Sequence, residues 1–71
     1  MGKQAYYETV RNGLIPVRNL RKAEDPALYK AEVMKTVYGY RKGETITGHR
    51  RYFVHKAGVK GYHQMVTEVQ L

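Results

Sequence analysis

The sequence predicts a single, mainly β domain over residues 1–71, with one short helix. Glycines divide the last third of the chain into short runs rich in β-branched and aromatic residues, a pattern typical of strands joined by tight turns. Asn12-Gly13 separates two more β-prone runs near the start. A chain of 71 residues is near the lower limit at which a hydrophobic core can hold a fold without disulfides or metals.

A β-hairpin is expected at the beginning of the chain. Its first strand lies within residues 3–11, and its second begins with the apolar run 14–17. Asn-Gly is a strong hairpin signal because both central residues of a type I′ turn need positive φ. Proline has no N–H for a ladder, so we expect Pro16 at a sheet edge or at a bulge.

One short helix is predicted over residues 26–35. Asp25 stands at a capping position, and Pro26 follows where the first helical residue would lie. The apolar face of this helix would hold Tyr29, Val33, Met34 and Val37. The alternative is a strand over residues 31–38, and a helical turn that runs into a strand near residue 34 would satisfy both interpretations.

A β-meander is predicted over residues 40–71. Its clearest strand covers residues 49–55, where Tyr52 and Val54 alternate with residues of the opposite face. A second strand covers residues 62–71. The linker 56–61 between them contains two glycines, which can take the positive φ that a hairpin loop requires.

Charge and aromatic content both favour a binding protein. The formal net charge is +7 and the pI is about 9.9, which favours nucleic acid, phosphate-bearing wall polymers, acidic lipid surfaces or an acidic protein face without choosing among them. The chain has seven tyrosines, one phenylalanine and no tryptophan. Tyrosine offers a flat apolar ring with a hydrogen-bonding tip, which suits both the edge of a small core and a binding groove.

Several classes of function are not expected. The six carboxylates are scattered, and the chain has no serine and no glycine-rich phosphate loop, so we predict that it is not an enzyme and needs no cofactor. It has no cysteine, and its three histidines have no metal-ligand spacing, so no metal site is predicted. Neither a signal peptide nor a transmembrane run is present, so we expect a cytoplasmic chain unless it belongs to an exported protein.

Cations and tyrosines alternate along the predicted meander. Such cations neutralise phosphates, while the rings stack on bases or sugars. The alternative is an ordinary solvated strand face whose lysines and arginines protect a sheet edge. The candidate ligand-binding residues are Arg41, Arg50, Arg51, Tyr52, Lys56, Lys60 and Tyr62.

Three segments resemble the bacterial Src-homology-3-like domain, a small barrel found in wall-binding modules of lysins and surface proteins. Segment 13–18, GLIPVR, resembles the opening strand of that family, and segment 37–46, VYGYRKGETI, resembles its diverging turn. Tyr52-Phe-Val, followed by segment 58–62, GVKGY, and a closing Val-x-Leu, resembles its ending. The resemblance covers about residues 13–71 and implies a small antiparallel barrel of about five strands.

The resemblance implies a non-enzymatic basic module that docks on an anionic polymer, with a bacterial cell-wall polymer favoured. The alternative is a small cytosolic regulator, of the kind a bacteriophage makes, that binds nucleic acid or a host nucleic-acid machine such as RNA polymerase. A structural part of a virion is a third class, which would self-associate through an edge strand near Pro16. We expect a monomer.

Overall fold

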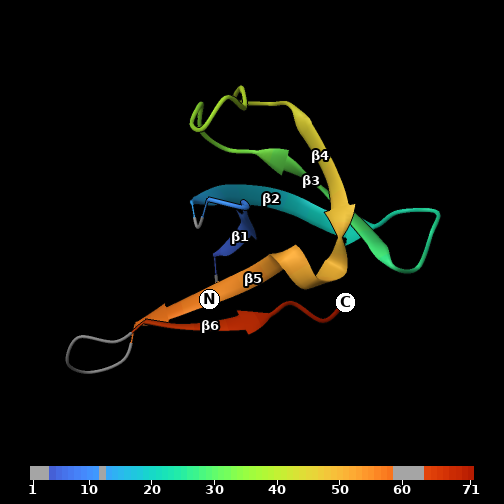
Figure 1. Cartoon of the computed structure of the whole chain (residues 1–71). Helices are drawn as coiled ribbons and strands as arrows, with labels where there is room; N and C mark the ends of the chain where they lie inside the picture. Colours follow the sequence, from blue (N-terminus) through green and yellow to red (C-terminus); the bar gives the residue numbers. More distant parts are fainter. Residues whose placement is uncertain (1–3, 12, 59–63) are drawn as a thin grey trace.

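The computed structural model describes residues 4–11, 13–58 and 64–71, and in them the chain is mainly β, as predicted (Figure 1). Their six strands form one antiparallel sheet in the order β4-β3-β2-β1-β5-β6. No helix in this part of the chain is long and apolar enough to cross a membrane. The elements are β1 (Ala5–Glu8), β2 (Leu14–Lys22), β3 (Leu28–Val33), β4 (Thr45–His49), the 3-10 turn η1 (Arg50–Tyr52), β5 (Phe53–Gly58) and β6 (Gln64–Glu68).

The sheet is strongly curled, so that β2 and β3 lie across from β5 and β6 (Figure 1). Residues after β6 cross the open side: the Val69 N–H donates to the Phe53 carbonyl at 3.0 Å, and the Leu71 N–H donates to the Tyr29 hydroxyl at 3.4 Å. The C-terminal residues therefore connect the two halves of the curled sheet.

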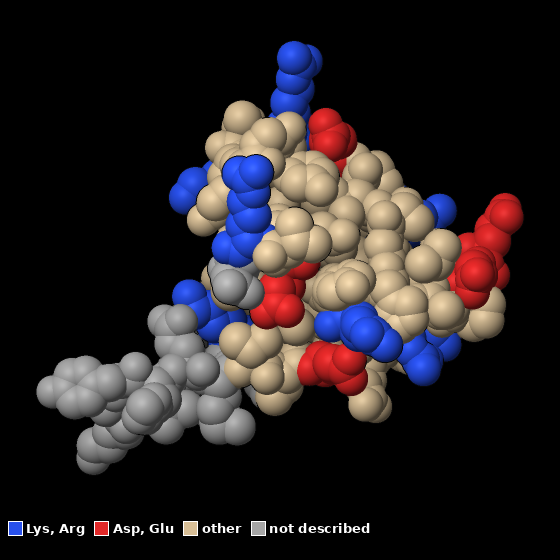
Figure 2. Space-filling view, viewed as in Figure 1, with Lys and Arg blue, Asp and Glu red and all other residues tan. Residues whose placement is uncertain are grey.

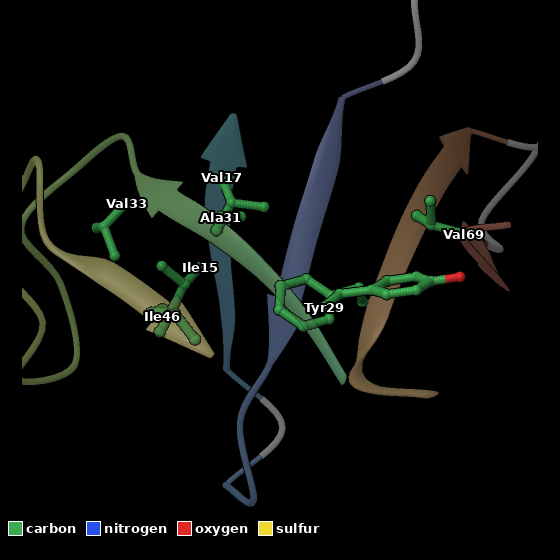
Figure 3. Close-up of a cluster of buried hydrophobic side chains, with 8 residues drawn as sticks. Ile15, Val17, Tyr29, Ala31, Val33, Ile46 and Val69 are labelled. Carbon is green, nitrogen blue, oxygen red and sulfur yellow. The ribbon is translucent and has the colours of Figure 1, made fainter. Parts of the chain in front are cut away.

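The core lies on the inner face of the curl, where every second residue of a strand points. In β3, Tyr29, Ala31 and Val33 are buried, while the residues between them are half-buried. Burial of a large side chain such as Phe53 contributes about 1.5–3 kcal/mol relative to leaving it exposed. The cluster consists of Ile15, Val17, Tyr29, Ala31, Val33, Ile46, Phe53 and Val69 (Figure 3).

The helix predicted over residues 26–35 is wrong, because this segment holds a turn and then β3. Asp25 accepts hydrogen bonds from the Ala27 N–H through its carboxylate and from the Leu28 N–H through its carbonyl. Aspartate followed by proline also begins a β-turn, so the same two residues fit a hairpin turn as well as a helix cap. Every second residue of β3 is buried, which is the pattern of a strand and not of a helix. This strand ends at Val33 rather than extending to residue 38.

The meander predicted over residues 40–71 is also wrong at one connection. β4 pairs with β3, whereas β5 pairs with β1 and β6, so β4 and β5 are not neighbours. The strand predicted over residues 49–55 is interrupted by η1, whose first turn is capped by His49: its Nδ1 accepts from the Arg51 N–H at 3.2 Å. This turn redirects the chain from β4, at one edge of the sheet, to β5, which lies between β1 and the other edge strand, β6.

The hairpin predicted at the beginning is confirmed, since β1 pairs with β2 antiparallel. Glu8 lies opposite Leu14, which leaves a loop of residues 9–13, closed by the Thr9 N–H donating to the Gly13 carbonyl at 2.8 Å. Asn12 lies outside the described residues, as do residues 62 and 63 of the second predicted strand. β6 covers residues 64–68 of that strand, whereas residues 69–71, which were predicted to belong to it, are not in a strand.

The prediction of a sheet edge or a bulge at Pro16 is wrong, because Pro16 lies in β2, between β1 and β3, and the register shift of β2 falls later, between Arg18 and Arg21. The Pro16 carbonyl accepts from the Met34 N–H at 2.9 Å, one residue beyond the end of β3. In a strand, the N–H and C=O of one residue point toward the same neighbouring strand. The nitrogen of Pro16 therefore faces the side of β3, but beyond the last residue of β3, where no ladder hydrogen bond is lost. The described edges are β4 and β6.

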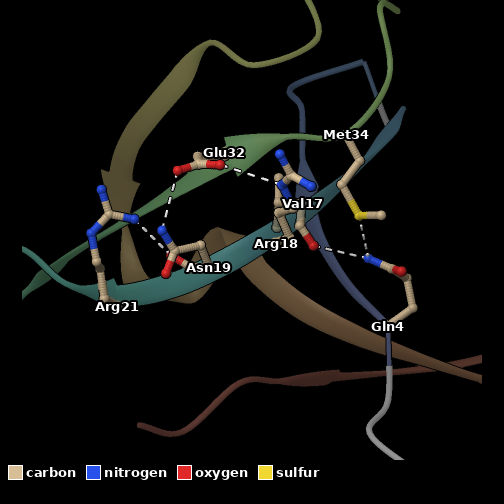
Figure 4. A network of polar contacts seen from close by, with 7 residues as sticks. All are labelled: Gln4, Val17, Arg18, Asn19, Arg21, Glu32 and Met34. Atoms are coloured by element: carbon tan, nitrogen blue, oxygen red, sulfur yellow. Dashed lines mark hydrogen bonds and ion pairs between the residues drawn. The ribbon is translucent and has the colours of Figure 1, made fainter.

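An irregular register marks the middle of β2, where the pairing with β3 shifts between Arg18 and Arg21. Asn19 has a φ of 56°, and its Nδ2 donates to the Glu32 carboxylate at 3.1 Å (Figure 4). Arg18 Nε lies 3.3 Å from the same carboxylate, and Arg21 donates to the Asn19 carbonyl at 2.7 Å. The Asn19 hydrogen bond, followed by Arg18, lowers the pKa of Glu32 below its ordinary value.

Two substitutions separate the backbone role of Asn19 from that of its side chain. Both Asn19→Gly and Asn19→Ala remove the hydrogen bond to Glu32, but only glycine adopts positive φ without strain. We expect the alanine variant to have the lower free energy of unfolding, by about 1 kcal/mol, in chemical denaturation. Equal stability of the two variants would show that the left-handed conformation of residue 19 is not under strain.

Candidate binding surface

A hollow of about 320 Å³ opens where the β1–β2 loop meets the long loop between β3 and β4. We call it the tyrosine groove. Tyr7 at its base comes from β1, whereas its walls come from the two loops. The lining residues are Tyr7, Thr9, Val10, Arg11, Tyr38 and Tyr40.

Tyr7 connects the groove to the core and to η1. Its ring centroid lies 5.0 Å from that of Phe53, 6.5 Å from that of Tyr40 and 6.3 Å from that of Tyr52. The two tyrosine pairs meet edge to face, at 71° and 74°, so these rings do not cover one another by stacking. Burial, together with the nearby Tyr40 and Tyr52, raises the pKa of Tyr7 above its ordinary value.

Tyr38 is held in an unfavourable backbone conformation in a two-residue turn. Val37 and Tyr40 exchange two backbone hydrogen bonds of 3.0 and 2.9 Å around it. Tyr38 has a φ of 50° and Gly39 a φ of 84°, the signs that a type I′ turn requires. Asn-Gly is the usual pair there, and a bulky residue at positive φ is uncommon. The residue Tyr38 is 63% exposed, so burial compensates little for this conformation.

Two glycines let the rings lie directly on the backbone. A Cβ at Gly13 would lie 2.8 Å from Cζ of Tyr38, and one at Gly48 would lie 2.9 Å from Cε1 of Tyr7. Both distances are below the van der Waals contact of carbon atoms, so a side chain at either position would displace a ring. These glycines therefore fix the shape of the groove.

Three of the residues predicted from the sequence lie in η1. Tyr52, 39% exposed, adjoins the groove through its contact with Tyr7. Arg50 and Arg51 line a second hollow, of about 380 Å³, together with Tyr29, His49 and residues 68–71. Glu68 in this hollow offsets part of their charge.

The other predicted residues are dispersed. Arg41 is exposed in the β3–β4 loop, next in sequence to Tyr40. Lys56 Nζ lies 5.9 Å from the centre of the Tyr6 ring. Successive strand residues point to opposite faces, so Tyr6 and Lys56 lie on the outer face, away from Tyr7. Lys60 and Tyr62 lie outside the described residues.

The face shown in Figure 2 does not carry one continuous patch of cations. Lysines and arginines stand apart on it, with aspartates and glutamates between them. Arg18–Glu32 is the one ion pair within 4.0 Å among the residues that the structure describes. The rings of the groove, rather than a dense cluster of charge, therefore distinguish this surface.

Sequence reasoning missed Tyr7 and Arg11, and it placed Tyr38 and Tyr40 among the cations of the meander without selecting them as candidate binding residues. The Tyr38-Gly39 pair was the available signal, because a two-residue turn needs positive φ at both positions. In the described ranges no three His, Cys, Asp or Glu side chains gather as metal ligands. Comparisons with protein-family models, curated proteins and solved structures find no match to this chain.

The strain at Tyr38 predicts that asparagine suits this turn better than tyrosine. We expect Tyr38→Asn to raise the free energy of unfolding by about 0.5 kcal/mol, because asparagine tolerates the left-handed region and little buried area is lost. Thermal and chemical denaturation measure this change. A clear loss of stability would mean that the contact of the ring with Gly13 outweighs the strain.

The raised pKa of Tyr7 predicts a loss of stability in alkali. Above about pH 10, Tyr7 of the unfolded chain ionises while that of the folded chain stays protonated, so ionisation favours unfolding. Tyr7→Phe keeps the ring and removes this proton. Between about pH 9 and 11, we expect the thermal midpoint of the wild type to fall more steeply than that of Tyr7→Phe. Parallel curves would contradict this assignment.

Proposed function

We propose that the protein is a non-enzymatic binding module whose tyrosine groove docks on an anionic polymer with a phosphate chain. The observation that carries the proposal is Tyr38, which exposes most of its ring above a hollow despite a strained backbone. Strain of this kind is typical of functional positions, where the conformation itself is needed. Arg11 lines the same hollow and supplies a positive charge there.

Further cations adjoin the other rings of the surface. Arg41 follows Tyr40 in the chain, and Arg51 precedes Tyr52 in η1. Neutralising phosphates with such side chains releases bound counterions, which supplies affinity that depends steeply on salt. The net charge of +7 adds a long-range attraction for any polyanion.

Two sources can supply the phosphate chain: a phosphate-bearing bacterial wall polymer and a nucleic acid. The resemblance to bacterial Src-homology-3-like domains favours the wall polymer. That resemblance implies an antiparallel, mainly β fold, and the described part of the chain has such a fold. The alternative, a bacteriophage-type regulator that binds nucleic acid or RNA polymerase, uses the same cations and rings. The experiments distinguish these sources.

Salt titration tests the contribution of the η1 cations. Binding of labelled inorganic polyphosphate, measured by fluorescence anisotropy, should weaken linearly on a log-log plot against salt concentration. Arg50→Gln combined with Arg51→Gln should reduce the slope by roughly 1.4, which corresponds to two lost phosphate contacts at about 0.7 each. Because both arginines are exposed, the thermal midpoint should stay nearly unchanged.

The matched control combines Lys22→Gln with Lys30→Gln, which removes the same charge from β2 and β3, outside both hollows. We expect this control to change the slope less than the η1 pair does. Binding that does not respond to salt would rule out the proposed function. Equal effects of the two pairs would show that only the overall charge matters.

A further inference from the structure

We propose that the tyrosine groove takes single-stranded nucleic acid, with a base stacked on the Tyr38 ring and the adjoining phosphate at Arg11. The inference rests on the proposed function and specifies its ligand. The two residues line one hollow from two different loops, so a ring and a cation meet at one place. This combination is the one that single-stranded nucleic acid needs.

The exposed rings offer faces on which a base can stack. Tyr38 is 63% exposed and Tyr52 39% exposed, whereas Phe53, another aromatic partner of Tyr7, is buried. Every base has a π-face that can stack on a free ring, and such stacking tolerates sequence changes. Inorganic polyphosphate has neither bases nor sugars, so it would bind through the cations of the surface alone.

The shape of the groove favours a single strand over a duplex. A hollow of about 320 Å³ is near the small end of pockets that hold a compact ligand. In a duplex the faces of the bases are covered by their neighbours, so a side chain can stack only on a base that has left the helix. The groove therefore selects a strand whose bases are already free.

Hydroxyl groups near the hollow add polar contacts for the strand. Tyr7 and Tyr40 line it, and Tyr52 adjoins Tyr7 at a centroid distance of 6.3 Å. Their phenolic groups donate and accept hydrogen bonds, as base edges and phosphate oxygens require.

The test compares three ligands of equal phosphate number: labelled oligothymidine, a DNA duplex and base-free inorganic polyphosphate. We expect oligothymidine to bind the wild type most tightly. Tyr38→Ala should weaken that binding about tenfold, the usual effect of losing one stacked base, while Tyr38→Phe keeps the ring and the affinity. Binding of polyphosphate should be the same in all three proteins.

Gly13→Ala gives a second variant that displaces the Tyr38 ring without removing it, and it should also weaken oligothymidine binding. Thermal unfolding of each variant shows that it is folded. Polyphosphate or duplex binding as tight as that of oligothymidine, or an unchanged affinity of Tyr38→Ala, would overturn the inference and leave the proposed function in place. If the wild type binds none of the three ligands, both the inference and the proposed function are wrong.

Discussion

The structure depends on the burial of Phe53 at the point where the chain leaves η1 and enters β5. Its side chain is 0% exposed and lies between the rings of Tyr7 and Tyr29, at 5.0 and 5.9 Å. Its carbonyl accepts from the Val69 N–H, so the same residue also holds the C-terminal segment. In a chain this small, few side chains can bring both ends of a curled sheet together, and Phe53 contacts residues from each of them.

The same residue positions the candidate site. Phe53 supports Tyr7 from the core, and Tyr7 in turn contacts Tyr40 of the long loop and Tyr52 of η1. Tyrosine suits this role because one end of the ring packs on apolar neighbours while the hydroxyl remains near water. The groove is thus the outer edge of the core, and the strained turn at Tyr38 adds a ring that lies on Gly13 and belongs to a mostly exposed residue.

The class of fold was predictable from the sequence because glycines and β-branched runs indicate strands directly, whereas the connections were not. Asp25-Pro26 begins a helix or a turn equally well, and only the inward-facing partners of β3 decide between them. The insertion of β5 beside β1 depends on contacts far apart in the chain, which no local pattern contains. The same limit applies to the site. The charge along the chain predicted Arg50 and Arg51 as binding residues, but Tyr38 and Arg11 line one hollow only because two loops come together.

The central claim is that a phosphate chain binds at the tyrosine groove. Aromatic proton NMR of the tyrosines during titration with oligothymidine tests it most directly, since the chain has no tryptophan and one phenylalanine. The account predicts upfield shifts of the Tyr38 and Tyr52 ring signals, with Tyr6 on the outer face unchanged. Shifts confined to Tyr6, or none at saturating ligand, would contradict it.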